Sequence, residues 1–134
     1  MSFFNILDVA STGLSAQRIR INVIASNMAN ANTTRTEAGG PYRKKNVVFE
    51  QVLRGEHRGG VKVKQITPDL KPASLRYEPG HPDANEEGYV AYPNINPVEE
   101  LVNMLEASRS YEANVTMVTT AKQLAQSAIG IASK

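Results

Sequence analysis

The sequence predicts an α+β fold in which two long terminal helices pair as a coiled coil and a small β-rich, extended segment lies between them. Three patterns predict it: an apolar heptad repeat near the N-terminus, an uninterrupted helical pattern up to the C-terminus, and frequent glycine and proline in between. The predicted division is therefore 1–32, 33–96 and 97–134, with both helices in one coiled-coil domain.

The N-terminal helix is predicted from apolar residues that alternate at steps of four and three. They run as Phe3, Leu7, Ala10, Leu14, Gln17, Ile21, Ile24 and Met28. This spacing is typical of a coiled-coil seam, on which a polar residue such as Gln17 tends to fix register or partner choice. Charged residues such as Asp8, Arg18 and Arg20 interrupt the apolar run. The segment is therefore too polar for a membrane span, which needs about 20 predominantly apolar residues.

The C-terminal helix has a clear start. Asn96 is a favourable N-cap, Pro97 suits the first helical position, and Glu99 completes a capping box. No proline follows, so the helix is expected to reach about Lys134, a length of roughly 55 Å at 1.5 Å per residue. Its predicted apolar face comprises Leu101, Met104 or Leu105, Tyr111, Val115, Val118, Ala121, Ala125, Ala128 and Ala132.

The middle segment is predicted to be β-rich because Gly39-Gly40-Pro41, Gly59-Gly60 and Pro79-Gly80 divide it into short pieces. The pieces with strand character are Val47–Phe49, Val61–Val63, Ser74–Tyr77 and Tyr89–Tyr92. Two long helices and short strands leave little room for a large independent core in a chain of 134 residues. The apolar stripes of the helices are thus expected to be covered by other subunits.

Charge is distributed unevenly along the chain. Residues 1–64 hold ten Lys and Arg against four Asp and Glu, whereas residues 65–134 hold five against nine. Oppositely charged halves favour oriented contacts between copies or relatives of one subunit. A nucleic-acid-binding alternative rests on the basic residues Arg43, Lys44, Lys45, Arg54, Arg58, Lys62 and Lys64. No known nucleic-acid-binding motif accompanies them.

Catalytic, cofactor and metal sites are not predicted. The chain has no cysteine, which excludes thiolate catalysis and thiolate metal ligands. His57 and His81 lie in polar loops without a local partner, and Glu99 with Glu100 is explained by the favourable placement of acidic residues in the first turn of a helix. The loop Asp83–Gly88 lacks the ligand spacing of a calcium loop.

An Asn-rich stretch at the end of the first helix carries the most specific signal. Asn27, Asn30 and Thr33, followed by Tyr42, resemble the N-terminal signature of the bacterial flagellar axial proteins, which form the rod, hook and distal filament parts. The Gly-Tyr pair expected directly after this signature is missing, and Tyr42 is predicted to take a related role. Tyr111 and Asn114, in Ser108–Asn114, resemble the C-terminal motif, and Gly13–Arg18, Gly40–Arg43, Tyr77–Pro79 and Gly88–Val90 resemble the proximal rod members in the family's order.

This resemblance implies a structural protein, with no reaction to assign, located in the basal body of the bacterial flagellum. It implies helical assembly into the hollow, torque-transmitting proximal rod, with the terminal helices in an inner layer and the middle segment as a small outer domain. The implied partners are copies of itself, other proximal rod proteins, the adapter at the membrane ring and the distal rod, with the flagellar export apparatus in transit. No cofactor, nucleic acid or membrane span is implied.

The assembly seam is expected to join one residue set from each helix, within or between subunits. The sets are Leu7, Leu14, Ile21, Ile24 and Met28 on the first helix and Leu101, Leu105, Val115, Val118 and Leu124 on the second. Arg18, Arg20 and Arg109 are weaker candidates for ion pairs between subunits. A soluble homo-oligomeric coiled-coil scaffold is the alternative, because it explains the stripes although not the ordered motifs.

Overall fold

The computed structural model describes residues 2–53, 55 and 58–134, so Arg54 and His57, considered above, lie outside the described residues. Its elements are α1 (Phe3–Ala29), β1 (Lys45–Gln51), β2 (Val61–Pro68), β3 (Ser74–Tyr77), β4 (Tyr89–Tyr92) and α2 (Pro97–Ala132). The predicted α+β class, with two long terminal helices and short strands between them, is confirmed. The supercoiling expected of a coiled coil remains a prediction.

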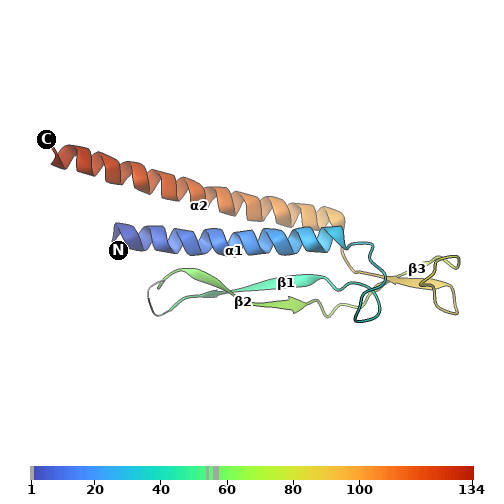
Figure 1. The fold of residues 1–134 in the computed structure, drawn as a ribbon. Helices are drawn as coiled ribbons and strands as arrows, with labels where there is room; N and C mark the ends of the chain where they lie inside the picture. The colour runs from blue at the N-terminus through green and yellow to red at the C-terminus, as the bar shows by residue number, and fades with distance from the viewer. Residues whose placement is uncertain (1, 54, 56–57) are drawn as a thin grey trace.

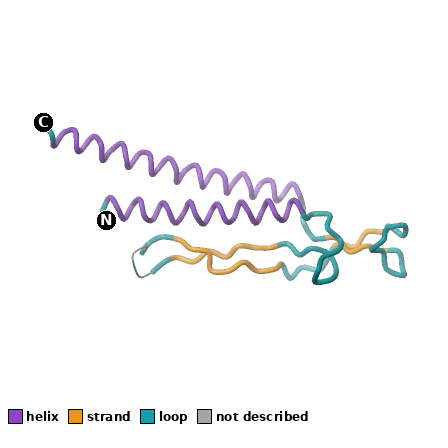
Figure 2. Tube along the Cα trace, in the orientation of Figure 1, coloured by secondary structure: helices purple, strands orange, loops and turns teal. Residues whose placement is uncertain are grey.

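The molecule is elongated, and α1 lies between α2 on one side and the β1–β2 hairpin on the other (Figure 1). The two helices run antiparallel, and the β3–β4 hairpin extends beyond the end opposite the chain termini (Figure 2). Because α2 is longer than α1 and diverges from it, the C-terminal turns of α2 project past the N-terminus of α1. The last turns of α2 therefore have no helix of their own chain beside them.

Both helices begin at side-chain caps. Ser2 Oγ accepts a hydrogen bond from the amide of Asn5 at 3.2 Å, and Asn96 Oδ1 accepts one from the amide of Val98 at 3.0 Å. Each cap satisfies one of the backbone donors that a helix N-terminus leaves unpaired. At its other end α1 stops at Ala29, three residues before the predicted boundary, where Asn30 Nδ2 donates to the carbonyl of Ser26 at 2.9 Å.

The strands form two separate antiparallel hairpins. The pairing of β1 with β2 shifts register between Val48 and Phe49, a bulge of the kind that bends and twists a strand. In the second hairpin Gly88 has a φ of +88°, and a Cβ there would lie 2.8 Å from the ring of Tyr77. Only glycine fits at this turn, which brings the Tyr77 and Tyr89 rings to a centroid distance of 5.3 Å.

The buried core is small and built largely from small side chains. Among the described residues the buried apolar ones are Ala10, Ala16, Ile24, Ala31, Val90, Tyr92 and Ala107. Many large apolar side chains remain exposed, above all on α2, where they are Val98, Leu101, Val102, Leu105, Val115, Met117, Leu124, Ile129 and Ile131. Single exposed apolar residues are normal, but a row of them along one helix marks a surface for another protein.

Candidate assembly interface

Asn27 connects the end of α1 to the start of β1. Its amide Nδ2 donates to the carbonyl of Lys45, and its Oδ1 accepts from the amide of Lys45, each at 2.9 Å. The hydroxyl of Tyr42 also donates to Oδ1, at 3.0 Å. Asn27 is 1% exposed, so these bonds satisfy a buried polar side chain. The Asn27 side chain thus pairs with both backbone groups of Lys45, as a neighbouring strand would, and these bonds fix the hairpin against α1.

Asn30, Thr33 and Tyr42 form the rest of this junction. Thr33 Oγ1 donates to Asn30 Oδ1 at 3.1 Å, and the amide of Tyr42 donates to the carbonyl of Thr33 at 3.0 Å. The Tyr42 hydroxyl also lies 3.3 Å from Ser26 Oγ. The four motif residues at this end, including Asn27, are thus joined in one hydrogen-bonded network that turns the chain from α1 into the hairpin.

A buried ion pair ties the first turn of α2 to the same junction. Lys44 Nζ lies 2.7 Å from Glu100 Oε1, and the Glu100 side chain is 1% exposed. A buried charge is tolerated only when it is paired, because its desolvation is costly. Sequence reasoning assigned Glu100 to the helix dipole and Lys44 to a basic surface patch. The sequence signal for the pair was the spacing of Glu100, which places it on the same helix face as the apolar residues Met104 and Ala107.

The C-terminal motif residues lie in the contact between the two helices. A Cβ added to Gly13 of α1 would lie only 3.0 Å from Asn114 Nδ2, whose amide group donates to the carbonyl of Ser110 at 3.0 Å. Tyr111 is partly buried one turn earlier on α2. Glycine at position 13 therefore allows the helices to approach closely at Asn114. Arg20 pairs within the chain with Glu106 at 3.3 Å, and the pairs expected between subunits for Arg18, Arg20 and Arg109 remain predictions.

The predicted seam residues of α1 are all at least partly covered. Ile24 is buried, and Leu7, Leu14, Ile21 and Met28 are partly buried. Gln17, the polar exception on the seam, has a buried Oε1 that accepts no hydrogen bond from the described residues. Its predicted role in fixing register or partner choice stays a prediction.

The predicted seam residues of α2 lie differently. Val118 is partly buried, whereas Leu101, Leu105, Val115 and Leu124 are exposed. The covered face of α2 carries the buried Glu100 and Ala107 together with the partly buried Met104, Tyr111, Asn114 and Ala121. Within one chain the three leucines and Val115 stay exposed, and their pairing between subunits remains a prediction.

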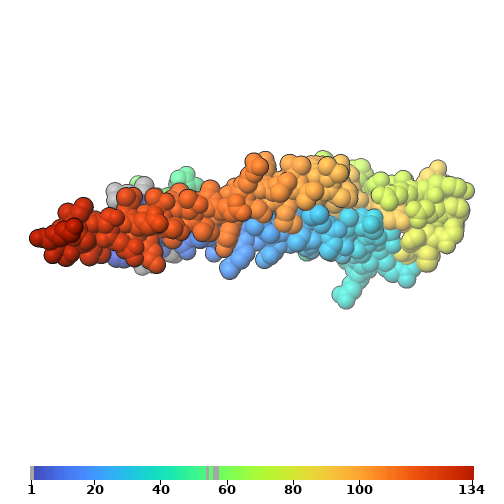
Figure 3. Space-filling view, turned by 90° about the horizontal axis from the view of Figure 1, so that it is seen from above, coloured from blue at the N-terminus to red at the C-terminus, as the bar shows by residue number. Residues whose placement is uncertain are grey.

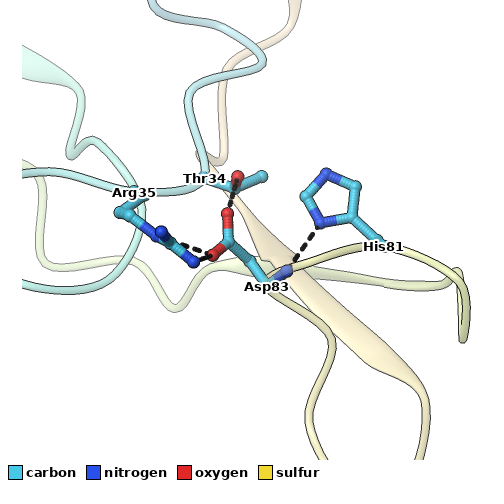
Figure 4. Close-up of polar contacts among 4 residues, drawn as sticks. All are labelled: Thr34, Arg35, His81 and Asp83. Carbon is cyan, nitrogen blue, oxygen red and sulfur yellow. Dashed lines mark hydrogen bonds and ion pairs between the residues drawn. The ribbon is translucent and has the colours of Figure 1, made fainter.

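A polar clamp holds the β3–β4 hairpin to the end of the helical pair (Figure 4). Thr34 Oγ1 donates to Asp83 Oδ2 at 2.7 Å, Arg35 forms an ion pair with Asp83 Oδ1, and the Asp83 amide donates to His81 Nδ1 at 3.0 Å. The Thr34 hydrogen bond, with the Arg35 charge, lowers the pKa of Asp83 below its usual value despite partial desolvation. The clamp therefore holds an ionised carboxylate between two segments distant in sequence.

In the part of the chain that the structure describes, no group of three His, Asp or Glu side chains is arranged to hold a metal ion. Within the same residues, neither helix has a stretch apolar and long enough to cross a membrane. The prominent features are therefore contact surfaces: the apolar face of α2, the polar junction after α1, and the clamp.

Two family models match the two ends of the chain. Residues 7–35 match the family described as "Flagella basal body rod protein", and residues 86–131 match "Flagellar basal body rod FlgEFG protein C-terminal". The first match includes Asn27, Asn30 and Thr33, and the second includes Tyr111 and Asn114. Both motifs on which the resemblance rested therefore fall inside matched regions.

Relatives align along nearly the whole chain. The "Flagellar basal-body rod protein FlgC" of Yersinia enterocolitica is 49% identical over 92% of this chain and 93% of its own length. The FlgC proteins of Borreliella burgdorferi and Bacillus subtilis are 42% and 40% identical, and each alignment covers 98% of this chain. The chain belongs to the FlgC family of flagellar basal-body rod proteins. It is accordingly a structural subunit of the basal-body rod. The hydrogen-bonded network of the motif residues and the exposed face of α2 are therefore features of a rod subunit.

Proposed function

We propose that this chain is a structural subunit of the proximal rod, which assembles helically with other rod proteins into a hollow shaft that transmits torque. The observation that carries the proposal is the end-to-end alignment with FlgC proteins at 40–49% identity. Because the match includes both terminal helices and the middle segment, it concerns the architecture of the whole subunit and not a single shared module.

The exposed apolar face of α2 supports the proposal. A subunit that works alone would bury such side chains, because each large apolar residue taken out of water contributes about 1.5–3 kcal/mol. Here Leu101, Leu105, Val115 and Leu124 stay exposed, and the only described residues of α2 that are buried are Glu100 and Ala107. Helical assembly offers cover for this face on neighbouring subunits. We assign two sets of side chains to this assembly seam. They are Leu7, Leu14, Ile21, Ile24 and Met28 on α1 and Leu101, Leu105, Val115, Val118 and Leu124 on α2.

In the proposed arrangement, the segments with the two terminal helices form one domain and the segment with the four strands forms another. Residues 1–32 and 97–134 form the inner domain around the export channel, and residues 33–96 form the outer domain. The proposed partners are copies of itself, other proximal rod proteins, the adapter at the membrane ring and the distal rod. The chain reaches them through the flagellar export apparatus, and its long, incompletely covered helices suit folding that is completed on assembly.

Complementation of a strain that lacks the gene for this chain tests the proposal. The wild-type chain restores motility and is recovered in isolated basal bodies, whereas Leu101→Asp does neither, because a charge would be buried without a partner. Leu70→Asp is the matched control, since Leu70 is 89% exposed and lies outside the helices. Restored motility with Leu101→Asp, or a wild-type chain that is absent from basal bodies, contradicts the proposal. Circular dichroism of both variants establishes that they keep the wild-type helix content.

A further inference from the structure

An apolar groove with a basic rim runs along the side of α1 that faces away from α2. It has a volume of about 1050 Å³, and its apolar lining includes Ile19 and Val23 of α1 with Ile66 and Pro68 of β2. Its charged lining residues are Arg43 and Lys45, both of which are exposed, and no acidic residue lines it. The groove is thus suited to an apolar ridge that brings negative charge with it.

The first two turns of α2 form such a ridge. Val98, Leu101, Val102 and Leu105 are 50–70% exposed. Their spacing of i, i+3, i+4 and i+7 places them on one face of the helix, opposite the face that packs on α1. The space-filling view from above shows α2 as the outer layer along this part of the molecule (Figure 3). We call these four side chains the α2 ridge, and we call the cavity described in the preceding paragraph the α1 groove.

The ridge and the groove match in pattern and length. Amphipathic helices bind hydrophobic grooves through anchors at i, i+3, i+4 and i+7, which is the spacing of the ridge. Ile19 to Ser26 on the groove and Val98 to Leu105 on the ridge each span about 10 Å at 1.5 Å per residue. Two apolar surfaces of equal length are therefore available at the same end of the molecule.

The charges around the two surfaces are complementary. The exposed charged residues in the N-terminal part of α2 are Glu99, Glu106, Arg109 and Glu112. Glu106 pairs with Arg20 of its own chain, so Glu99 and Glu112 are the acidic residues available to Arg43 and Lys45 of a second copy. The projecting end of α2 is a poorer occupant, because its charged residues, Lys122 and Lys134, are basic like the groove. Charge complementarity of this kind selects partner and orientation.

We propose that the α2 ridge of one copy of this chain binds the α1 groove of a second copy lying beside it. The inference rests on the proposed function, because the rod brings copies of the chain together. The ridge of a chain cannot enter its own groove, since α1 separates α2 from that side (Figure 1). The contact joins two different surfaces and is heterologous, so that it repeats from copy to copy and generates a ring or an open helix.

Cysteine cross-linking tests this contact directly, because the chain has no cysteine of its own. Two differently tagged copies are expressed together in the deletion strain, one carrying Ile66→Cys in the groove and the other Leu101→Cys on the ridge. Basal bodies are isolated and treated with a short thiol-specific cross-linker. We expect a product that contains both tags. The matched control replaces Leu101→Cys with Leu124→Cys, which is 67% exposed on the same helix but outside the ridge.

The yields decide between the outcomes. A product with Leu101→Cys at least tenfold above that with Leu124→Cys supports the contact. Equal yields, or no product although both tags are present in the basal bodies, overturn the contact and leave the proposed function intact, including the case in which another rod protein occupies the groove. If both tags are absent from basal bodies, and the wild-type chain expressed in the same deletion strain is absent as well, the proposed function and the contact are overturned together.

Discussion

Replacing Asn27 by alanine tests whether the junction after α1 holds the β1–β2 hairpin in place. The substitution removes two hydrogen bonds to the backbone of Lys45 and one from the hydroxyl of Tyr42. At a net value of about 1 kcal/mol each, the three bonds are worth about 3 kcal/mol. Alanine regains about 0.6 kcal/mol through its higher helix propensity. The expected loss in free energy of unfolding is therefore about 2–3 kcal/mol.

Urea unfolding of the purified chain, followed by circular dichroism, measures this loss. The matched control is Asn22→Ala on the same helix, because Asn22 is exposed and its replacement should only stabilise the chain, by about 0.6 kcal/mol of helix propensity. Hydrogen exchange adds a local test, since the amide of Lys45 loses its acceptor and should exchange faster in Asn27→Ala alone. A loss below about 1 kcal/mol, with unchanged exchange at Lys45, would refute the assigned role of Asn27.

Three further predictions concern the helix contact, the buried ion pair and the clamp. Gly13→Ala should destabilise the wild-type chain through overpacking against Asn114, whereas in an Asn114→Ala background it should stabilise the chain by about 1 kcal/mol. Urea unfolding of the wild type, the two single variants and the double variant measures both effects. A change of the same sign in both backgrounds would contradict the contact. Lys44→Met should cost about 3–5 kcal/mol by leaving a buried charge unpaired, and adding Glu100→Leu should recover most of it; failure to recover would argue against the pair. Because the pKa of Asp83 is lowered on folding, its stabilisation is complete above the unfolded value near 3.8 and is lost as the pH falls below it; acid titration of stability should lose this step in Asp83→Asn.

The parts of the fold that follow from local sequence were predictable. The cap at Asn96 and the proline after it set the start of α2, as predicted. The bounds of β3 and β4 were also predicted, because Pro79, Gly80 and Gly88 mark the turns between them. These features depend on residues within a few positions of one another, so the sequence pattern contains the information.

The rotation of α2 about its own axis was not predictable in the same way. The helix carries apolar residues on more than one face, and sequence spacing alone selected Leu101 and Leu105 as seam residues without singling out Ala107. The contact that selects the face is long-range, because it depends on Gly13 lying opposite Asn114. With this contact in place Ala107 is buried, and Leu101 and Leu105 stay exposed.

Long-range polar contacts were missed for the same reason. Asn27 was recognised by its motif, but its partner Lys45 lies beyond a loop whose path no local rule supplies. The ion pair of Lys44 with Glu100 joins residues more than fifty positions apart, and each had a sufficient local explanation. The clamp between Arg35 and Asp83 likewise joins residues 48 positions apart in the sequence.

The most direct test of the subunit role is a cryo-electron-microscopy reconstruction of the rod in isolated basal bodies, with this chain fitted to the density. We predict that neighbouring subunits cover the exposed face of α2, including Leu101 and Leu105, and that α1 and α2 lie in the inner layer. A reconstruction in which this face is open to solvent, or in which the chain is absent from the rod, would contradict the proposed role.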